Sequence, residues 1–303
     1  MIIVFGSNVL DLFFQQADLP EKDKALFLDS HAEQPGGKGA NQAIAAARAG
    51  AEVKFFGALG TGGHGRHMFK NLSQNGIDIA GIEFLDMPSG LATIFVDEAD
   101  GTHRIVVSQG ANLHAKQDTI PGKLLTDKTA ILIQGELPMD ETEKLIHRGK
   151  QAGCRTVMNF APAIQPLSET LLNDLDVIIL NEYEAEALGK QYDMQVFSKH
   201  DLAMALYKRF DMVTIITLGG NGSITAADGE IFSTPAMAIT PIDTVGAGDA
   251  FTGYFCAALD RGETVKQAVY EGGVAGSITC TKIGAQTALP SREEVAAQLE
   301  KAA

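Results

Sequence analysis

Short apolar runs alternate along this chain with longer segments in which apolar residues recur every three or four positions. The short runs predict strands, and the longer period predicts amphipathic helices. The predicted strands span residues 2–5, 52–58, 130–134, 156–159, 177–180 and 214–218. The predicted helices span residues 38–49, 65–75, 140–152, 182–188, 199–210, 247–261, 264–281 and 292–301. This alternation indicates repeated strand and helix units, and therefore an α/β fold.

Several of the predicted strands are apolar on both faces, as in the runs at 2–5, 130–134 and 177–180. A strand that is half exposed would alternate apolar with polar residues instead. Strands without that alternation are typical of the centre of a parallel sheet that helices cover on both sides. We therefore expect a central, mostly parallel β-sheet.

Two segments follow a different pattern. Residues 89–96 and 103–108 are rich in β-branched residues and flank an acidic turn that contains Gly101, which predicts a hairpin. Together with residues 11–34, this hairpin predicts a small sheet that stands off the main one. No composition shift, proline-rich linker or internal repeat marks a second domain. We expect one domain over residues 1–303, with lid segments at about 11–34 and 89–108.

The charge balance limits the classes of partner. With 38 acidic and 24 basic residues the formal net charge is −14, so binding to nucleic acid or to an anionic membrane surface is not expected. No apolar stretch approaches the roughly 18 residues of a membrane span. Cys154, Cys256 and Cys280 are far apart and form no metal or disulfide pattern, which favours a reducing cytoplasm. The histidines show no ligand spacing, so oxygen atoms are the expected metal ligands.

Glycine is enriched, with 32 residues, and much of it falls in clusters. Gly60 to Gly65 matches G-x-G-x-x-G after a predicted strand, the spacing of a dinucleotide site. However, that fingerprint normally opens the first strand–helix unit, and no acidic residue clearly closes the next strand. We interpret this cluster as a turn before a helix. Gly36-Gly37-Lys38-Gly39 is not a P-loop, because glycine follows the lysine, but it offers bare backbone, Lys38 and Asn41 to a hydroxyl-rich ligand.

The sharpest motif is Asp243-Thr244-Val245-Gly246-Ala247-Gly248-Asp249, which leads into an apolar helix. Small residues leave backbone N–H groups uncovered, and at a helix N-terminus these donors attract an anion such as a transferring phosphoryl group. Asp249, at the rim, is placed to accept the proton of an attacking hydroxyl. The alternative is that Asp249 only caps the helix. Capping does not account for Gly246, Ala247 and Gly248, so we expect a catalytic site.

These motifs resemble those of the ribokinase family of carbohydrate kinases, also called the PfkB family. Gly36 to Ala43 is similar to its early sugar-binding signature, in the form found in ribokinases, and Asp243 to Asp249 is similar to its late signature. The resemblance spans the chain and implies a three-layer α/β body with a central, mostly parallel sheet and a β-sheet lid. It also implies transfer of the γ-phosphate of ATP to the primary hydroxyl of a pentose such as D-ribose.

The resemblance implies a role for each matching position. Asp249 is the catalytic base, and the backbone of Gly246, Ala247 and Gly248 forms the anion hole. The sugar contacts are Asp11, Gly37, Lys38, Gly39, Asn41, Glu136 and Asp249. The nucleotide contacts are Asn181, Thr217, Leu218, Gly219, Gly220, Asn221, Gly222 and Gly248. Glu184 acts indirectly on Mg²⁺. A monovalent-cation (K⁺) site is implied at Asp243, Val245, Thr279, Lys282, Gly284 and Ala288, mostly through backbone oxygens.

Three positions depart from the family pattern. Val9 stands where ribokinases have an asparagine that binds the sugar, with Asn8 one position earlier. Gly272 stands where a histidine or asparagine often lies beside the adenine, and Ala288 replaces a serine at the cation site. None of these touches the phosphoryl-transfer motif, so kinase activity is a firmer expectation than ribose specificity.

Several alternatives stay open. The chain could be another kinase of the family, acting on deoxyribose, fructose, 2-keto-3-deoxygluconate or a nucleoside, or a non-catalytic sugar- or nucleotide-binding regulator. The expected ligands are a sugar, ATP, Mg²⁺ and K⁺. Because a lid leaves an unpaired sheet edge, we also expect a homodimer formed through the lid.

Overall fold

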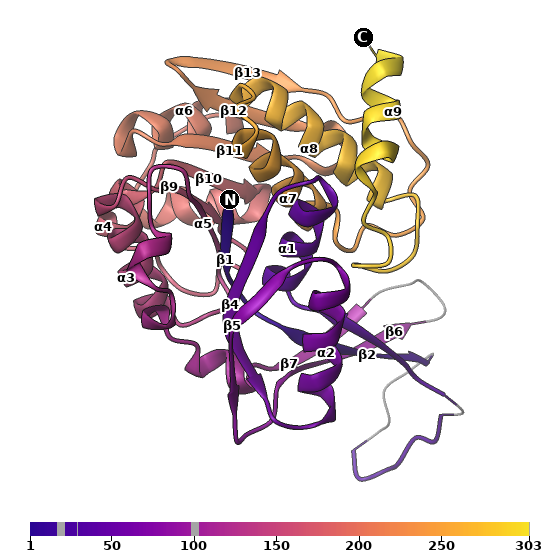
Figure 1. Ribbon diagram of the computed structural model, residues 1–303. Helices are drawn as coiled ribbons and strands as arrows, with labels where there is room; N and C mark the ends of the chain where they lie inside the picture. The colour runs from indigo at the N-terminus through magenta and orange to yellow at the C-terminus, as the bar shows by residue number, and fades with distance from the viewer. Residues whose placement is uncertain (17–21, 29, 98–102, 303) are drawn as a thin grey trace.

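A computed structural model describes residues 1–16, 22–28, 30–97 and 103–302, which form two β-sheets and surrounding helices (Figure 1). The larger sheet has nine strands in the order β13-β12-β11-β10-β9-β8-β1-β4-β5. In chain order these strands are β1 (Ile2–Phe5), β4 (Val53–Gly60), β5 (Asp78–Leu85), β8 (Ala130–Gln134), β9 (Arg155–Asn159), β10 (Val177–Asn181), β11 (Val213–Thr217), β12 (Ser223–Ala227) and β13 (Glu230–Thr234).

Seven strands of this sheet, from β11 to β5, run parallel, and β12 and β13 are added antiparallel at one edge. The period of two in β1 explains the layering. Ile2 and Val4 pack in one buried apolar cluster, whereas Ile3 and Phe5 pack in another. The predicted central, mostly parallel sheet with helices on both faces is therefore confirmed.

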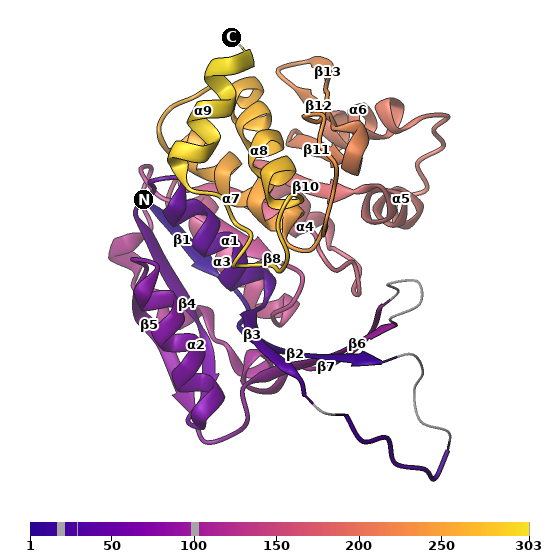
Figure 2. The ribbon, with the colours of Figure 1, turned by 90° about the vertical axis from the view of Figure 1, so that its right-hand side faces the viewer.

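Helices cover both faces of the larger sheet (Figures 1 and 2). One face carries α1 (Lys38–Arg48), α7 (Ala247–Asp260), α8 (Val265–Thr279) and α9 (Arg292–Ala302). The other carries α3 (Met139–Gln151), α4 (Glu169–Asp174), α5 (Glu182–Gln191) and α6 (Lys199–Phe210). Helix α2 (Gly63–Gln74) packs beside β4 and β5, with Met68 and Leu72 buried.

The smaller sheet projects from the body on the side away from α9 (Figure 2). Its strand order is β3-β2-β6-β7, with β2 (Val9–Gln16), β3 (Ala32–Gly36), β6 (Gly90–Asp97) and β7 (His103–Ser108). The predicted hairpin is confirmed, since β6 and β7 pair antiparallel. Its turn at 98–102, and residues 17–21 and 29 of the other lid segment, lie outside the described residues. The division into one body and a lid stays a prediction.

The sequence pattern missed four elements: β5, β12, β13 and α4. Strands β5 and β13 lie at the two edges of the larger sheet and are largely exposed, so they carry no continuous apolar run. Helix α4 has only six residues, too few for a helical period to show. The first lid segment also differs, because its strands begin at Val9 and end at Gly36.

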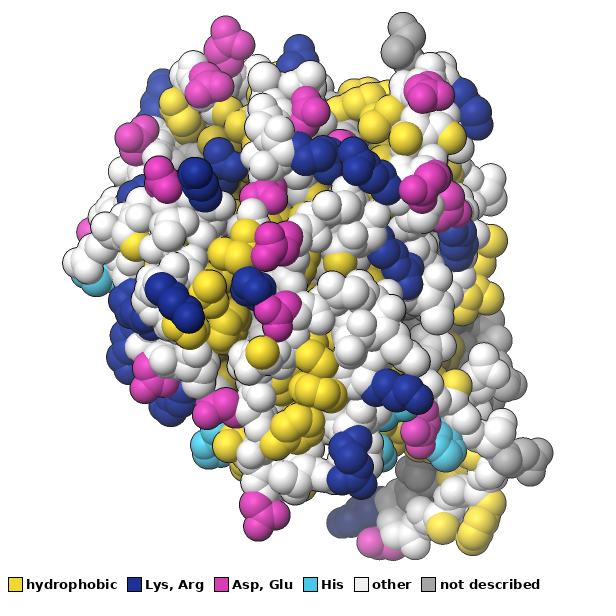
Figure 3. All heavy atoms as spheres, viewed as in Figure 1, with side chains coloured by type: hydrophobic (Ala, Val, Ile, Leu, Met, Phe, Trp, Pro, Cys, Tyr) yellow, Lys and Arg dark blue, Asp and Glu magenta, His cyan; other side chains and the backbone are white. Residues whose placement is uncertain are grey.

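The surface agrees with the charge argument. On the face in Figure 3, Lys and Arg side chains are interspersed with Asp and Glu and do not merge into one basic area. Among the residues the structure describes, no helix is long and apolar enough to cross a membrane.

Candidate active site

A cavity of about 750 Å³ opens at the carboxyl ends of β9, β10 and β11, beside the N-terminus of α7. This size is typical of ligand sites, and the carboxyl ends of parallel strands are where α/β folds bind ligands. Predicted site residues that line it are Lys38, Asn181, Glu184, Thr217, Gly219, Gly220, Gly222, Gly246, Ala247, Gly248 and Asp249. The structure thus brings residues from distant parts of the chain together.

Asp249 lies in the first turn of α7, three residues after Gly246, which occupies the N-cap position. Asp249 is only 6% exposed, and both oxygens of its carboxylate accept hydrogen bonds. Asn41 Nδ2 donates to Oδ2, and Gln42 Nε2 donates to Oδ1, each at 2.9 Å. Because Gly246 and not Asp249 is the N-cap residue of α7, the capping alternative does not describe the role of Asp249 here.

The first turn of α7 meets the conditions for an anion site. Gly246 has φ +78, a left-handed conformation that sets the direction in which α7 begins. A Cβ on Gly246 would lie 3.1 Å from Ala285 Cα. Gly248 is exposed to the cavity, and a Cβ on it would meet no atom within 4 Å. The helix N-terminus therefore presents bare backbone at its positive end, where negative charge is stabilised.

Glycine packing holds the sugar-site candidates close together. Gly37 has φ +91 and lies against the backbone of Val9, and a Cβ on Gly39 would overlap the backbone of Ser7. A Cβ on Gly36 would overlap the carboxylate of Asp11, which pairs across from Gln34 on β3. These contacts bring the start of α1 against β2.

Glu136 ties the same region to β8. Its carboxylate accepts from the Lys38 backbone N–H at 3.0 Å and from the Ser7 hydroxyl, whose oxygen also accepts from the Gly39 N–H at 3.3 Å. The Gly-Gly-Lys-Gly backbone is therefore hydrogen-bonded to Glu136 at Lys38 and packs closely on Asp11 at Gly36. This leaves the Lys38 side chain at the wall of the cavity.

The site is strongly acidic, with Lys38 as a counter-charge. Burial, then the negative charges of Glu136 and Asp249, raise the pKa of Asp11 to about 7. Burial also raises the pKa of Glu136, against the lowering effect of Ser7 and Lys38. Burial lowers the pKa of Lys38, but Asp249, Glu136 and Glu184 together raise it above its ordinary value. Lys38 therefore stays charged within this group of carboxylates.

The nucleotide-site candidates divide into two groups. Asn181 and Glu184 form a reciprocal cap on α5: the Glu184 N–H donates to Asn181 Oδ1 at 2.9 Å, and the Asn181 N–H donates to Glu184 Oε2 at 2.7 Å. Burial raises the pKa of Glu184, against the lowering effects of the Asn181 N–H and Lys38. The second group is the turn after β11. Thr217, Gly219, Gly220 and Gly222 line the cavity, whereas Leu218 and Asn221 lie in the turn without lining it.

The predicted cation-site residues are partly brought together. Asp243 joins the loops before α7 and after α8, since its Oδ1 accepts from the Val245 N–H at 3.0 Å and its Oδ2 from the Gly284 N–H at 2.9 Å. The Thr279 hydroxyl instead donates to Ala275 O, and the Lys282 ammonium pairs with Glu294 at 2.6 Å. These two side chains are engaged elsewhere, so only their backbone oxygens fit a cation. Ala288 is fully buried.

Three site residues were missed by sequence reasoning: Ser7, Gln42 and Asn159. Gln42 Nε2 also donates to Asn159 Oδ1 at 2.9 Å, and Gln42 Oε1 accepts from Gln134 Nε2 at 2.8 Å, so a chain of buried carboxamides supports Asp249 from behind. Asn41 and Gln42 are two carboxamides among the buried alanines of α1, a pattern that marks the pair but does not identify their partners.

Comparisons with known proteins agree with this geometry. The pattern of the pfkB family of carbohydrate kinases matches residues 1–292. Ribokinase from Haemophilus influenzae is 34% identical over 270 residues, which cover 88% of both chains. Deoxyribokinase from Salmonella typhimurium is 29% identical over 297 residues, covering 97% of this chain and 96% of the relative.

Solved structures agree as well. The crystal structure of ribokinase from Thermotoga maritima has a TM-score of 0.91 and 30% identity, and the match covers 99% of each chain. Ribokinase from Cryptococcus neoformans, solved in complex with ADP, has a TM-score of 0.84 and 27% identity, covering 98% of this chain and 99% of the other.

Proposed function

The chain belongs to the pfkB family of carbohydrate kinases, and from this premise we propose that it transfers the γ-phosphate of ATP to the primary hydroxyl of a pentose, D-ribose first. The observation that carries the proposal is the position of Asp249. It lies at the bare N-terminus of α7, in the wall of a cavity of about 750 Å³, with both carboxylate oxygens held by amides. A base and an anion site are thus adjacent.

The proposed reaction is an in-line displacement. The sugar hydroxyl oxygen forms a bond to the γ-phosphorus while the bond to the ADP oxygen breaks, and Asp249 takes the hydroxyl proton. The N–H groups of Gly246 to Gly248 face the charge that spreads over the transferring group. Positioning and electrostatics supply most of the catalysis in such a site.

Asp11, Glu136 and Asn41 are proposed to hold the sugar. Asn41 Oδ1 is buried and has no hydrogen-bond partner among the described residues, so a ligand hydroxyl at this point would supply its missing donor. The turn after β11 is proposed to hold the nucleotide, which agrees with the glycines that keep its backbone bare. Gly222, at φ +87, is packed so closely on Thr234 that a Cβ would overlap its carbonyl oxygen.

Mg²⁺ and K⁺ are proposed cofactors. The described residues contain no group of three or more acidic, histidine or cysteine side chains that could hold a metal. Asn181 and Glu184 fit an indirect role: Mg²⁺, when bound, would neutralise phosphate charge, and these two residues would hold it through water. Asp243 fits a K⁺ site as the residue that orders the loops. The free thiols of Cys154, Cys256 and Cys280 agree with a proposed cytoplasmic location.

One observation favours a second candidate, a deoxyribose kinase. Val9 is 6% exposed and packs with Ala92 and Ile94, two positions before Asp11 on the same strand. An apolar side chain offers no partner to a sugar hydroxyl, which favours a pentose that lacks one. The deoxyribokinase relative supports this alternative, whereas the ribokinase relatives favour ribose.

A coupled assay of ADP release with MgATP, with and without K⁺, tests the proposal across ribose, 2-deoxyribose, fructose, 2-keto-3-deoxygluconate and adenosine. We expect the highest kcat/KM with ribose and a higher rate with K⁺. A higher kcat/KM with 2-deoxyribose would favour the second candidate. Ligand-induced thermal stabilisation without ADP release from any of them would instead indicate a binding regulator.

A further inference from the structure

The chain crosses between the body and the small sheet at neighbouring points. Asn8 precedes β2, residues 86–89 precede β6, and residues 109–112 follow β7. We propose that Asn112 is a positioning residue for the sugar: it fixes the start of β2, and through it Asp11, to the body. This inference rests on the proposed function, because Asp11 is its proposed sugar ligand.

Asn112 holds Asn8 with both ends of its carboxamide. Its Oδ1 accepts from the Asn8 N–H at 3.0 Å, and its Nδ2 donates to the Asn8 carbonyl oxygen at 2.8 Å. Asn112 is 1% exposed, so neither bond competes with bulk water. Asp11 follows Asn8 by three residues, and Ser7, which binds Glu136, precedes it. These two bonds, the clamp, therefore hold the residue that lies between Ser7 and Asp11 in the chain.

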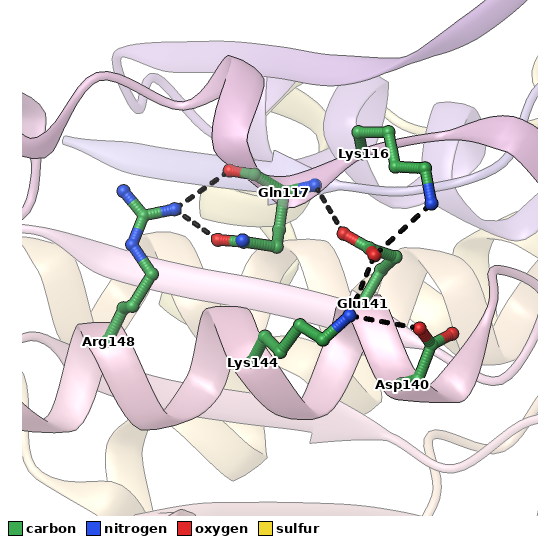
Figure 4. Close-up of polar contacts among 6 residues, drawn as sticks. All are labelled: Lys116, Gln117, Asp140, Glu141, Lys144 and Arg148. Carbon is green, nitrogen blue, oxygen red and sulfur yellow. Dashed lines mark hydrogen bonds and ion pairs between the residues drawn. The ribbon is translucent and has the colours of Figure 1, made fainter.

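The segment that carries Asn112 is itself packed on the body of the molecule. It lies in the short 3₁₀ helix η1 (Gly110–His114), and its neighbours Ala111 and Ala115 are fully buried in the cluster that includes α3. The next turn is fixed to α3 as well (Figure 4). The Gln117 N–H donates to the Glu141 carboxylate at 3.1 Å, and Arg148 donates to the carbonyl oxygens of Gln117 and Ile120 at 2.9 and 3.0 Å.

The cluster Gly60 to Gly65 has its role at this junction. The Gly60 N–H donates to Ser89 Oγ at 2.8 Å, and a Cβ on Gly60 would overlap the carbonyl oxygen of Met87. A Cβ on Gly65 would overlap the carbonyl oxygen of Gly60 and lie 2.9 Å from Ser89 Oγ. These glycines allow the segment before β6 to lie against the turn between β4 and α2. The spacing that suggested a dinucleotide site thus serves packing here.

Asn112 lies against the starts of both β2 and β6. Val9 and Gly90 are register partners in the parallel pair of β2 and β6. A Cβ on Gly90 would overlap Asn112 Nδ2 and lie 2.7 Å from the Asn8 carbonyl oxygen. The Ala111 N–H also donates to the Pro88 carbonyl oxygen at 3.0 Å. One buried side chain therefore sets where both strands leave the body.

Loss of the Asn112 bonds is expected to weaken sugar binding and to leave nucleotide binding unchanged. Asp11 is carried by β2, beyond the junction, whereas the proposed nucleotide contacts lie at the ends of β10 and β11, in the turn after β11 and at the N-terminus of α7. Without the clamp, Asp11 loses its fixed position relative to Glu136 and Asp249. Part of the free energy of sugar binding is then spent on ordering β2, whereas nucleotide binding does not depend on β2.

The test compares Asn112→Ala with Asn71→Ala. Asn71 also donates a side-chain hydrogen bond, to Gln286 Oε1 at 2.6 Å, but it ties α2 to another loop and does not touch the junction. Two lost hydrogen bonds predict that Asn112→Ala raises the KM for the sugar about tenfold while the KM for ATP changes less than about twofold. Asn71→Ala should leave both values unchanged.

Hydrogen exchange of the ligand-free protein gives a readout that needs no activity. In Asn112→Ala the backbone amides of β2 and β6 should exchange faster than in the wild type, with those of β10 and β11 unchanged. Unchanged exchange in β2, or an equal rise in both KM values, would overturn the proposal. If this variant does not fold, Ser89→Ala replaces it and should raise only the KM for the sugar. A wild type with no kinase activity would refute the proposed function and leave the exchange test standing.

Discussion

Asp11 is the side chain whose ionisation bears most directly on sugar binding. Its carboxyl group lies beside Glu136 and Asp249, and its pKa is about 7, far above the ordinary value of 3.8. It therefore takes up a proton as the pH falls through about 7, and a neutral carboxyl group accepts hydrogen bonds from sugar hydroxyls less strongly.

We predict that the KM for the sugar rises as the pH is lowered from about 8 to about 6, with ATP saturating. In Asp11→Asn the KM should be higher throughout, and this pH dependence should disappear. Steady-state kinetics at several pH values measure both. A pH dependence of equal size in Asp11→Asn would show that another group is responsible.

At the scale of single residues, the acidic and small members of the site could be predicted from the sequence and its resemblance, whereas Ser7, Gln42 and Asn159 could not. Each of these three acts through a contact with a residue far away in the chain, as when Gln42 joins Asp249 to Asn159. Neither periodicity nor a short motif contains that information. Buried polar side chains of this kind become interpretable only when their partners are known.

At the scale of elements, two glycines at the N-terminus of α7 are expected to have different roles. Gly246 is needed for the backbone conformation, whereas Gly248 is needed for the space that the phosphoryl group occupies. Gly246→Ala forces a Cβ into a left-handed conformation, at about 1 to 2 kcal/mol, and against Ala285. Gly248→Ala meets no atom and has an ordinary helical position, so it should not reduce stability.

We predict that Gly246→Ala lowers both the melting temperature and kcat, whereas Gly248→Ala lowers kcat alone, because its methyl group enters the space of the transferring phosphoryl group. Thermal denaturation and the ADP-release assay measure the two effects separately. Full kcat in Gly248→Ala would show that this face of α7 does not meet the phosphoryl group.

Most buried elements were predictable, whereas the two edge strands of the larger sheet and the short buried strand β12 were not. The helix expected at 247–261 is Ala247–Asp260, and the strand expected at 130–134 is found with the same bounds. Both consist mainly of apolar residues because they lie inside the molecule. Strands β5 and β13 take their place from backbone pairing with a neighbour, which a single sequence does not show.

At the scale of the whole molecule, strand β7 is an edge strand of the small sheet, with no further strand paired to it among the described residues. Ile105, Val106 and Val107 are each more than half exposed on this edge strand of the small sheet. Three adjacent exposed apolar residues on an unpaired edge are rare in monomers, because such an edge pairs with other chains. The proposed homodimer through the lid would cover them.

We predict a solution mass of twice the chain mass of 32.1 kDa at micromolar concentration, measured by sedimentation. Val106→Lys places a charge at the centre of the edge and should shift the protein to the monomer. Phe197→Lys, which also replaces an exposed apolar residue with lysine but lies between α5 and α6, is the control and should leave the mass unchanged. A monomeric wild type would contradict the proposed dimer.

The acidic balance of the molecule is compatible with an anionic substrate, because the site does not depend on a basic surface. Lys38 and the bare N-terminus of α7 act over short distances inside a cavity, where charge is little screened. The net charge of −14 therefore argues against polyanions and not against ATP.

The release of ADP by the wild type and by Asp249→Asn, with MgATP and D-ribose, tests the central claim most directly. The substitution preserves the size of the side chain and removes the base, so we predict that kcat falls by roughly 10² to 10⁴. The melting temperature should stay close to that of the wild type. Turnover near the wild-type value in Asp249→Asn would contradict the assignment of Asp249 as the base of a sugar kinase.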